Sequence, residues 1–319
     1  MKRLVIGIIT IIIVILLGTM IFFLRRNGEN MENINDDLSS IEDKIIIENA
    51  TKIICKNIYK DNASQKEDLY NIINQDKINK IVELLNNQEL NELYEGTSEQ
   101  NYIEISIYDN EQEKHLTIYE NNIKLDEKKY KINSELYKDL VNILNPTYYL
   151  HNSDLELPNQ DTCKKMQKKS LNGLTESETE EVSKKLREAH TTMEFLLING
   201  TKNLKQSNSI YWNLYNEAEA ITEPTGEELE FSKNSCFRAT ANNIMDIVNI
   251  IKDEETVELF NSIYEELNKA MEYKDIGEIF EVHEKIHDYD YWIINYPAHY
   301  DTAPAPDWEG IETYFGTTM

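Results

Sequence analysis

Glycine, proline and cysteine are scarce in this sequence. Its 319 residues include 10 glycines, 6 prolines and 3 cysteines. Low-complexity disordered chains are rich in glycine and proline, so this composition argues against long disordered stretches. The sequence contains no C-x-x-C pair and no cluster of cysteine with histidine, which excludes the common zinc-finger and thiol-redox motifs.

The three cysteines allow one intrachain disulfide at most. Cys55 lies in an apolar run that begins at Ile53, and we expect it to be a small buried hydrophobic residue. Cys163 and Cys236 are expected to share the C-terminal part of the chain. There they could pair with each other in an oxidising compartment.

Positive charge is also scarce. Lys and Arg total 32 against 58 Asp and Glu, for a formal net charge of −26. A negative field of this size repels the phosphates of nucleic acids and of anionic lipid surfaces, so no nucleic-acid partner is expected. It would attract a basic partner or divalent cations, although surface charge most often serves solubility.

Several catalytic motifs are absent as well. No P-loop, no G-x-G-x-x-G and no G-x-S-x-G occurs in the sequence, so the motifs of common nucleotide-binding sites and of the serine hydrolases are missing. Serine, histidine and aspartate are all present, but nothing in their spacing selects a catalytic triad.

One long hydrophobic run is present, at residues 4–24. These 21 positions hold no charged side chain, and as a helix they would extend about 31 Å, the thickness of a bilayer's hydrocarbon core. A cleavable signal peptide has a shorter apolar region that ends in small residues, whereas this run ends in Ile-Phe-Phe-Leu-Arg-Arg. We therefore expect residues 1–26 to form an uncleaved membrane anchor.

The charges that flank this run bear on its orientation. Lys2 and Arg3 precede it, Arg25 and Arg26 follow it, and the next cation is Lys44. With the α-amino group added, the N-terminal side carries more positive charge, which favours a cytoplasmic N-terminus. We expect a single-pass protein of the plasma membrane whose large C-terminal part lies outside the cytoplasm. The abundance of Ile, Asn, Lys and Glu suggests a bacterial source.

The rest of the chain divides by composition into four parts. The linker among them holds two of the six prolines and a basic run at residues 164–169, which we expect to be a solvated loop or helix face. The predicted parts are a polar spacer at 27–40, a small α+β domain at 41–145, the linker at 146–174 and a helical bundle at 175–319.

The small α+β domain contains the clearest strand pattern. From Tyr102 to Tyr108, isoleucines alternate with polar or tyrosine side chains, and the pattern returns from His115 to Tyr119. A period of two is typical of strands with one buried face. We expect an antiparallel sheet covered by helices from Asp76 to Asn87 and from Ser134 to Leu144, where Asp76 and Ser134 act as caps.

From Thr175 onward the sequence predicts helices. Thr175 and Glu178 form a capping box, and apolar residues then follow at helical spacing up to Gly200, which is expected to end the first helix. Successive amphipathic helices with short connections predict an antiparallel bundle. Further helices are expected at 209–221, between Gly226 and Lys252, at 255–273 and from 275 onward.

Residues 289–319 differ from the helices before them. They hold two of the three tryptophans and three of the six prolines. We expect this segment to leave the helices and fold back over the bundle as an aromatic strap, since large aromatics are costly to leave in water. The alternative is a surface that binds a peptide or glycan through Tyr291, Trp292, Tyr296 and Trp308.

Residues 283–287 read H-E-K-I-H, which matches the H-E-x-x-H signature of zinc metallopeptidases. On a helix, His283 and His287 lie one turn apart on the same face, so both imidazoles could bind one zinc ion. Glu284 could then act as the base on a zinc-bound water. A membrane-anchored zinc metallopeptidase is therefore one hypothesis.

The surroundings of this motif argue against a peptidase. A third ligand is needed, and the glycine and third histidine of the metzincins do not follow; Glu309 and Glu312 lie at a suitable distance, but in a proline-rich segment. Charged residues flank the motif, and the predicted strands lie far upstream. The simpler interpretation gives both histidines partners without a metal, from nearby carboxylates and aromatics: Asp288, Asp290 and Tyr291.

These observations favour a non-enzymatic binding or interaction module at the cell envelope, with a protein or a cell-wall component as its partner. No cofactor is expected on this interpretation, and zinc is expected only for the peptidase alternative. A sensor that signals through the single helix is a third hypothesis. It would need another subunit, because only three residues precede the apolar run.

Overall fold

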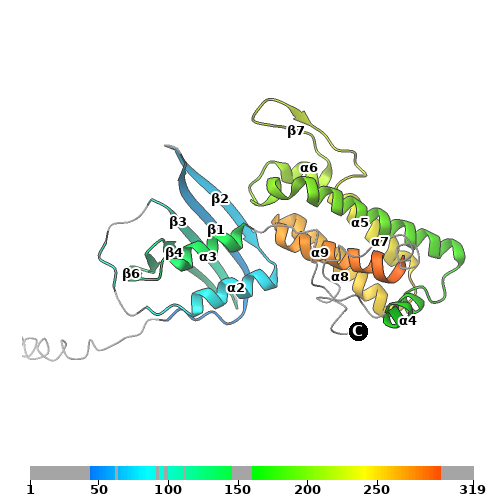
Figure 1. The fold of residues 1–319 in the computed structure, drawn as a ribbon, viewed down its shortest axis with the longest axis horizontal. Coiled ribbons are helices and arrows are strands. Elements are labelled where there is room, and N and C mark those ends of the chain that lie inside the picture. Colours follow the sequence, from blue (N-terminus) through cyan, green and yellow to red (C-terminus); the bar gives the residue numbers. More distant parts are fainter. Residues whose placement is uncertain are drawn as a thin grey trace, which may run out of the picture. The chain divides into compact units, whose positions relative to one another are not determined.

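The structure is a computed structural model that describes residues 44–61, 64–90, 93–96, 100–110, 112–145 and 160–295. The expected anchor at residues 4–24 and the polar spacer after it lie outside the described residues. Within the described residues, no helix is both long and apolar enough to cross a membrane. An antiparallel sheet comes first and a helical region follows, as the sequence predicts (Figure 1).

The sheet has six strands in the order β2-β1-β3-β4-β5-β6, and all neighbouring strands are antiparallel. The alternation predicted from Tyr102 to Tyr108 is confirmed, because Ile103, Ile105 and Ile107 are buried. The strands are β1 (Ala50–Asp61), β2 (Ser64–Ile72), β3 (Tyr102–Asp109), β4 (Gln112–Tyr119), β5 (Asn122–Leu125) and β6 (Lys128–Lys131).

Two helices, α2 (Gln75–Asn86) and α3 (Glu135–Leu144), lie together on one face of the sheet (Figure 1). Both were expected, but α2 begins earlier than the sequence suggested. Asn74 rather than Asp76 is its cap, since the Asn74 side chain accepts a hydrogen bond from the backbone N–H of Lys77 at 2.9 Å. Their buried apolar residues are Ile78, Ile81, Leu85, Leu136, Leu140 and Leu144.

Four long helices enclose the apolar core of the helical region. Helix α5 packs on α7, α7 on α8, α8 on α9 and α9 on α5. These helices are α5 (Glu176–Leu204), α7 (Phe237–Ile250), α8 (Glu254–Tyr273) and α9 (Ile276–Asp288). The shorter elements of this region are α4 (Gln160–Ser170), α6 (Tyr211–Glu217), β7 (Ile221–Thr222) and β8 (Glu228–Leu229).

The start of α5 is as predicted and its end is not. The backbone N–H of Thr175 donates to the Glu178 carboxylate at 2.6 Å, and the N–H of Glu178 donates to the Thr175 hydroxyl at 3.2 Å, so the capping box is confirmed. The helix then continues past Gly200 to Leu204. Gly200 lies against the ring of Tyr215, where a Cβ would collide, so this glycine permits a close approach and does not end the helix.

The chain between α5 and α7 is less helical than expected. Helix α6 ends at Glu217, before Ala218 in the left-handed region at φ 56°. Gly226, at φ 85°, lies in the turn between β7 and β8. The expectation of helix directly after Gly226 is therefore wrong, because that segment forms a hairpin strand and a loop before α7 begins at Phe237.

The chain does not leave the helices at residue 289. Helix α9 continues as a π-helical turn, η1 (Tyr289–Ile294). The expectation that this segment departs from the helices is wrong at its start, because Tyr289, Trp292 and Ile293 are buried in the same apolar core. Residues 296–319 lie outside the described residues, so the aromatic strap stays a prediction.

Candidate functional site

Three histidines meet inside the helical region. His190 lies on α5, and His283 and His287 lie on α9. The ring centroids are 5.5 Å apart for His190 and His283, 4.9 Å for His190 and His287, and 6.0 Å for His283 and His287. These residues are 5%, 2% and 7% exposed. The packing of α5 on α9 thus adds a third imidazole to the H-E-x-x-H motif.

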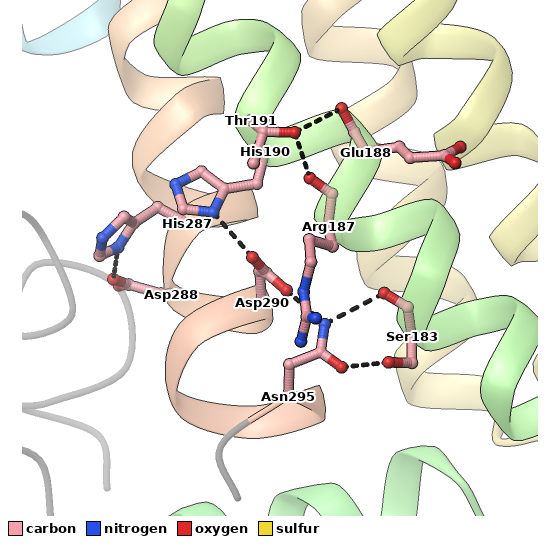
Figure 2. A network of polar contacts seen from close by, with 9 residues as sticks. All are labelled: Ser183, Arg187, Glu188, His190, Thr191, His287, Asp288, Asp290 and Asn295. Atoms are coloured by element: carbon pink, nitrogen blue, oxygen red, sulfur yellow. Dashed lines mark hydrogen bonds and ion pairs between the residues drawn. The ribbon is translucent and has the colours of Figure 1, made fainter. Parts of the chain in front are cut away.

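An aspartate orients His190. Nδ1 of His190 lies 2.8 Å from Oδ2 of Asp290 on η1 (Figure 2). An ionised carboxylate can only accept, so Nδ1 is the donor of this contact, and in a neutral imidazole Nε2 is then the acceptor nitrogen. Nε2 is buried and has no hydrogen-bond partner among the described residues. A buried polar atom of this kind is uncommon in folded proteins and costs free energy.

Asp290 is held in place by a second layer of contacts. The side-chain amide of Asn295 donates to Oδ1 of Asp290 and, at 3.1 Å, to the backbone carbonyl of Ser183. The Ser183 hydroxyl donates to the Asn295 side chain. This network joins α5 to the end of η1 (Figure 2). Such supporting contacts fix the orientation of a histidine in many metal sites.

His287 has the neighbours that the sequence suggested. Its Nδ1 lies 3.3 Å from Oδ1 of Asp288, and its ring stacks on Tyr291 with centroids 5.2 Å apart and an interplanar angle of 13°. Asp290 was also expected beside the motif histidines, but it bonds to His190. Glu284, the base of the peptidase hypothesis, is half-buried on α9.

Burial sets the charge of this cluster. Desolvation, together with the nearby His190 and His287, lowers the pKa of His283 well below its ordinary value, which leaves a neutral imidazole at pH 7. Desolvation and then the charge of Glu284 raise the pKa of Asp288 well above its ordinary value. On α4, burial and then Asp288 raise the pKa of Cys163 to about 11, so its sulfur is a thiol.

The spacing of the imidazoles suits a metal ion. A tetrahedral zinc ion with Zn–N bonds of about 2.1 Å holds the centroids of two bound imidazoles about 5 Å apart. Among the described residues, however, no group of three or more His, Cys, Asp or Glu side chains is already placed to hold a metal. Binding at the three histidines would therefore require their rings to turn toward a common centre.

His190 is the residue that sequence reasoning missed. It lies four residues after Leu186 and three before Met193, both of which are buried on α5, so all three share one helix face. A histidine on an otherwise apolar face was the available signal. Its partner Asp290 lies 100 residues later in the chain, and no local pattern predicts that contact.

The structure also places the two cysteines and one of the aromatic residues that the sequence singled out. Cys163 and Cys236 are buried free thiols, so the disulfide between them is not formed. Trp292 is 5% exposed and belongs to the core, so it cannot be part of an aromatic binding surface. Tyr296 and Trp308 lie outside the described residues.

Comparison with known proteins assigns no family. No protein-family model, no curated protein and no solved structure matches the chain.

Proposed function

We propose that the protein is a metal-binding module of the cell envelope, which holds one transition-metal ion through His190, His283 and His287. The observation that carries this proposal is the approach of three buried imidazoles, with centroids 4.9 to 6.0 Å apart. Neutral imidazole is the commonest protein ligand of zinc and also suits copper, iron and nickel.

The surroundings of His190 favour a role as a metal ligand over a purely structural role in the core. Its Nε2 is buried without a hydrogen-bond partner among the described residues, and a cation bound to the neutral imidazole there would offset the cost of that burial. The carboxylate of Asp290 on the opposite ring nitrogen fixes the tautomer, as it does in the carboxylate–histidine pairs of zinc proteins.

Asp288 is the candidate for a fourth ligand. It is fully buried beside His287, and its Oδ2 has no hydrogen-bond partner among the described residues. Four protein ligands would close the site, and closed sites are structural, whereas catalytic zinc keeps one open position. In this proposal the ion joins α5 to α9 and stabilises the helical region.

The same burial argues against the peptidase hypothesis. His283 and His287 are 2% and 7% exposed, so a peptide carbonyl would not reach an ion between them without rearrangement of α5 or α9. We therefore rank peptidase activity through Glu284 second. The anchor at residues 4–24 would hold the metal-binding region at the outer face of the plasma membrane.

Metal analysis of the full-length protein tests the proposal. The protein is purified in detergent, stripped with a chelator, equilibrated with Zn²⁺ or Co²⁺ and dialysed. We expect one ion per chain, a tetrahedral Co²⁺ absorption spectrum and a metal-dependent rise in the melting temperature. His190→Ala should lose all three.

Two further variants separate loss of the site from loss of the fold. His115→Ala alters an exposed histidine of β4, and it should keep the ion. Asp290→Asn preserves the shape of the side chain but removes the negative charge beside His190. It should weaken metal binding about 10- to 100-fold. A folded wild-type chain that retains no metal, or a folded His190→Ala variant that still binds one ion per chain, would overturn the proposal.

A further inference from the structure

A surface cavity of about 500 Å³ lies between α5 and α7. This volume falls within the range of ligand sites in proteins, roughly 300–1,000 Å³. Its residues differ from those of the histidine cluster, although α5 contributes to both. The inference drawn from it is therefore independent of the metal proposal.

Amides and hydroxyls dominate the lining of this cavity. Asn234, Asn242 and Asn243 contribute side-chain amides, and Thr191 and Thr192 contribute hydroxyls. The three amides make no hydrogen bond to another described residue, so all of their donors and acceptors are available to a ligand. Each amide can donate two hydrogen bonds and accept two, which matches ligands rich in hydroxyl groups.

The charges around the cavity cancel. Lys185 and Asp246 form an ion pair with Nζ and Oδ2 2.6 Å apart, so neither is free to hold an ionic ligand. Lys233 and Glu188 add one charge of each sign. A lining without net charge does not favour an anionic or a cationic ligand, because either would meet as much repulsion as attraction.

The cavity offers little to an apolar ligand. Ala239 is the one apolar residue among the described residues that line it, so an aliphatic or aromatic side chain of a peptide would find little apolar contact. No aromatic ring is among these lining residues either, so hydrogen bonds must supply the affinity.

We propose that this cavity binds a neutral saccharide, one sugar unit lying across the amides of α7 and the threonines of α5. The hydroxyl groups of the sugar would exchange hydrogen bonds with Asn242, Asn243 and Thr192. If the chain lies outside the cytoplasm, uncharged sugars of the cell wall are the available source of such a ligand.

Saturation-transfer NMR with the full-length protein tests this inference. The protein is held in a detergent that is not a glycoside, so that the detergent does not compete. The probe is a tetramer of N-acetylglucosamine, and a tetramer of galacturonic acid serves as the anionic comparison. We expect saturable transfer of magnetisation from the protein to the neutral probe, and clearly less transfer to the anionic probe. Removal of metal ions with a chelator should not change this result.

Matched variants on one helix locate the binding site. Asn242→Leu and Asn243→Leu should each weaken binding roughly fivefold, the effect of one lost hydrogen bond. Asn249 is exposed on the same helix seven residues after Asn242, so it shares that face, but it does not line the cavity. Asn249→Leu should leave binding unchanged.

Three results would overturn the inference. These are the absence of saturable transfer, a preference for the anionic probe, and variants at Asn242 and Asn243 that bind as the wild type does. Circular dichroism of each variant shows that it is folded.

Discussion

Single residues decide how closely the elements of the helical region approach one another. Gly200 lies within α5, where a glycine ordinarily lowers helix stability by about 1 kcal/mol relative to alanine. The ring of the buried Tyr215 from α6 occupies the place that a Cβ at this position would need. The unfavourable helix propensity is therefore offset by the packing of α6 on α5.

Gly200→Ala should lower the free energy of unfolding by about 1–2 kcal/mol. The added methyl group would overpack the contact with Tyr215, and overpacking costs about 1–3 kcal/mol. Because the tyrosine ring is rigid, we expect the upper part of that range. The higher helix propensity of alanine returns about 1 kcal/mol of this cost. Urea denaturation measures the difference.

A second background checks the physical reason for this loss. In a Tyr215→Leu protein the ring is absent, so Gly200→Ala should become neutral or stabilising there. A stabilising Gly200→Ala in the wild-type background would show that the two residues do not limit each other.

Helices and strands lie where the sequence predicts them when local patterns determine their bounds. They differ from the prediction where contacts with other segments determine those bounds. The strand β3 has a period of two, and its burial alternates as expected. The capping box fixed the start of α5 because all of its partners lie within four residues. The sequence does not predict the end of α5 or the start of η1, because glycine and aromatic residues there pack against other segments.

The capping box makes α5 sensitive to acid. The backbone N–H of Thr175, then its side chain, and then Lys252 lower the pKa of Glu178 from 4.5 to about 2. The folded-state pKa lies below the unfolded one, so the stabilisation is present above pH 4.5 and is lost as the pH falls toward 2. Glu178→Gln should remove this part of the pH dependence of unfolding.

A neighbouring glutamate provides the control for Glu178. Glu180 is exposed on the same helix, and Glu180→Gln should leave the acid branch of the stability curve as in the wild type. Equal effects of the two substitutions would indicate a general response to net charge.

Hydrogen bonds of Asn295 add to the attachment of the turn η1 to α5. Asn295→Ala would leave Oδ1 of Asp290 without the amide donor and would break the bonds to Ser183. Each hydrogen bond lost in this way costs about 0.5–1.5 kcal/mol. We expect faster amide hydrogen exchange across residues 289–294, measured by mass spectrometry.

Asn199 supplies the matched control for that experiment. It is exposed, and among the described residues its amide bonds only to the carbonyl of Phe195 within α5. Asn199→Ala should leave exchange at residues 289–294 unchanged. Unchanged exchange in Asn295→Ala would mean that the network does not hold η1.

For the whole molecule, the sequence predicted the order of the parts better than it predicted the site. It placed an antiparallel sheet before a helical region, and the structure agrees. It singled out His283 and His287, whose helical spacing of four is visible in the chain, but only as ligands of the alternative zinc peptidase. It could not identify His190, whose position beside them depends on how α5 packs against α9.

The membrane anchor is a prediction about the whole molecule. Full-length protein should stay with the membrane fraction through a carbonate wash, and deletion of residues 1–26 should release it. Release of the protein expressed from the full sequence without detergent, as a shortened chain that begins beyond Arg26, would show that the apolar run is a signal peptide.

The most direct test of the metal centre is X-ray absorption at the zinc edge of the full-length, zinc-loaded protein. The three histidines and Asp288 predict a first shell of nitrogen and oxygen at about 2.0–2.1 Å, with the outer-shell scattering of imidazole. A sulfur ligand at about 2.3 Å, as from the buried Cys163, or a shell without imidazole scattering would contradict the proposed site.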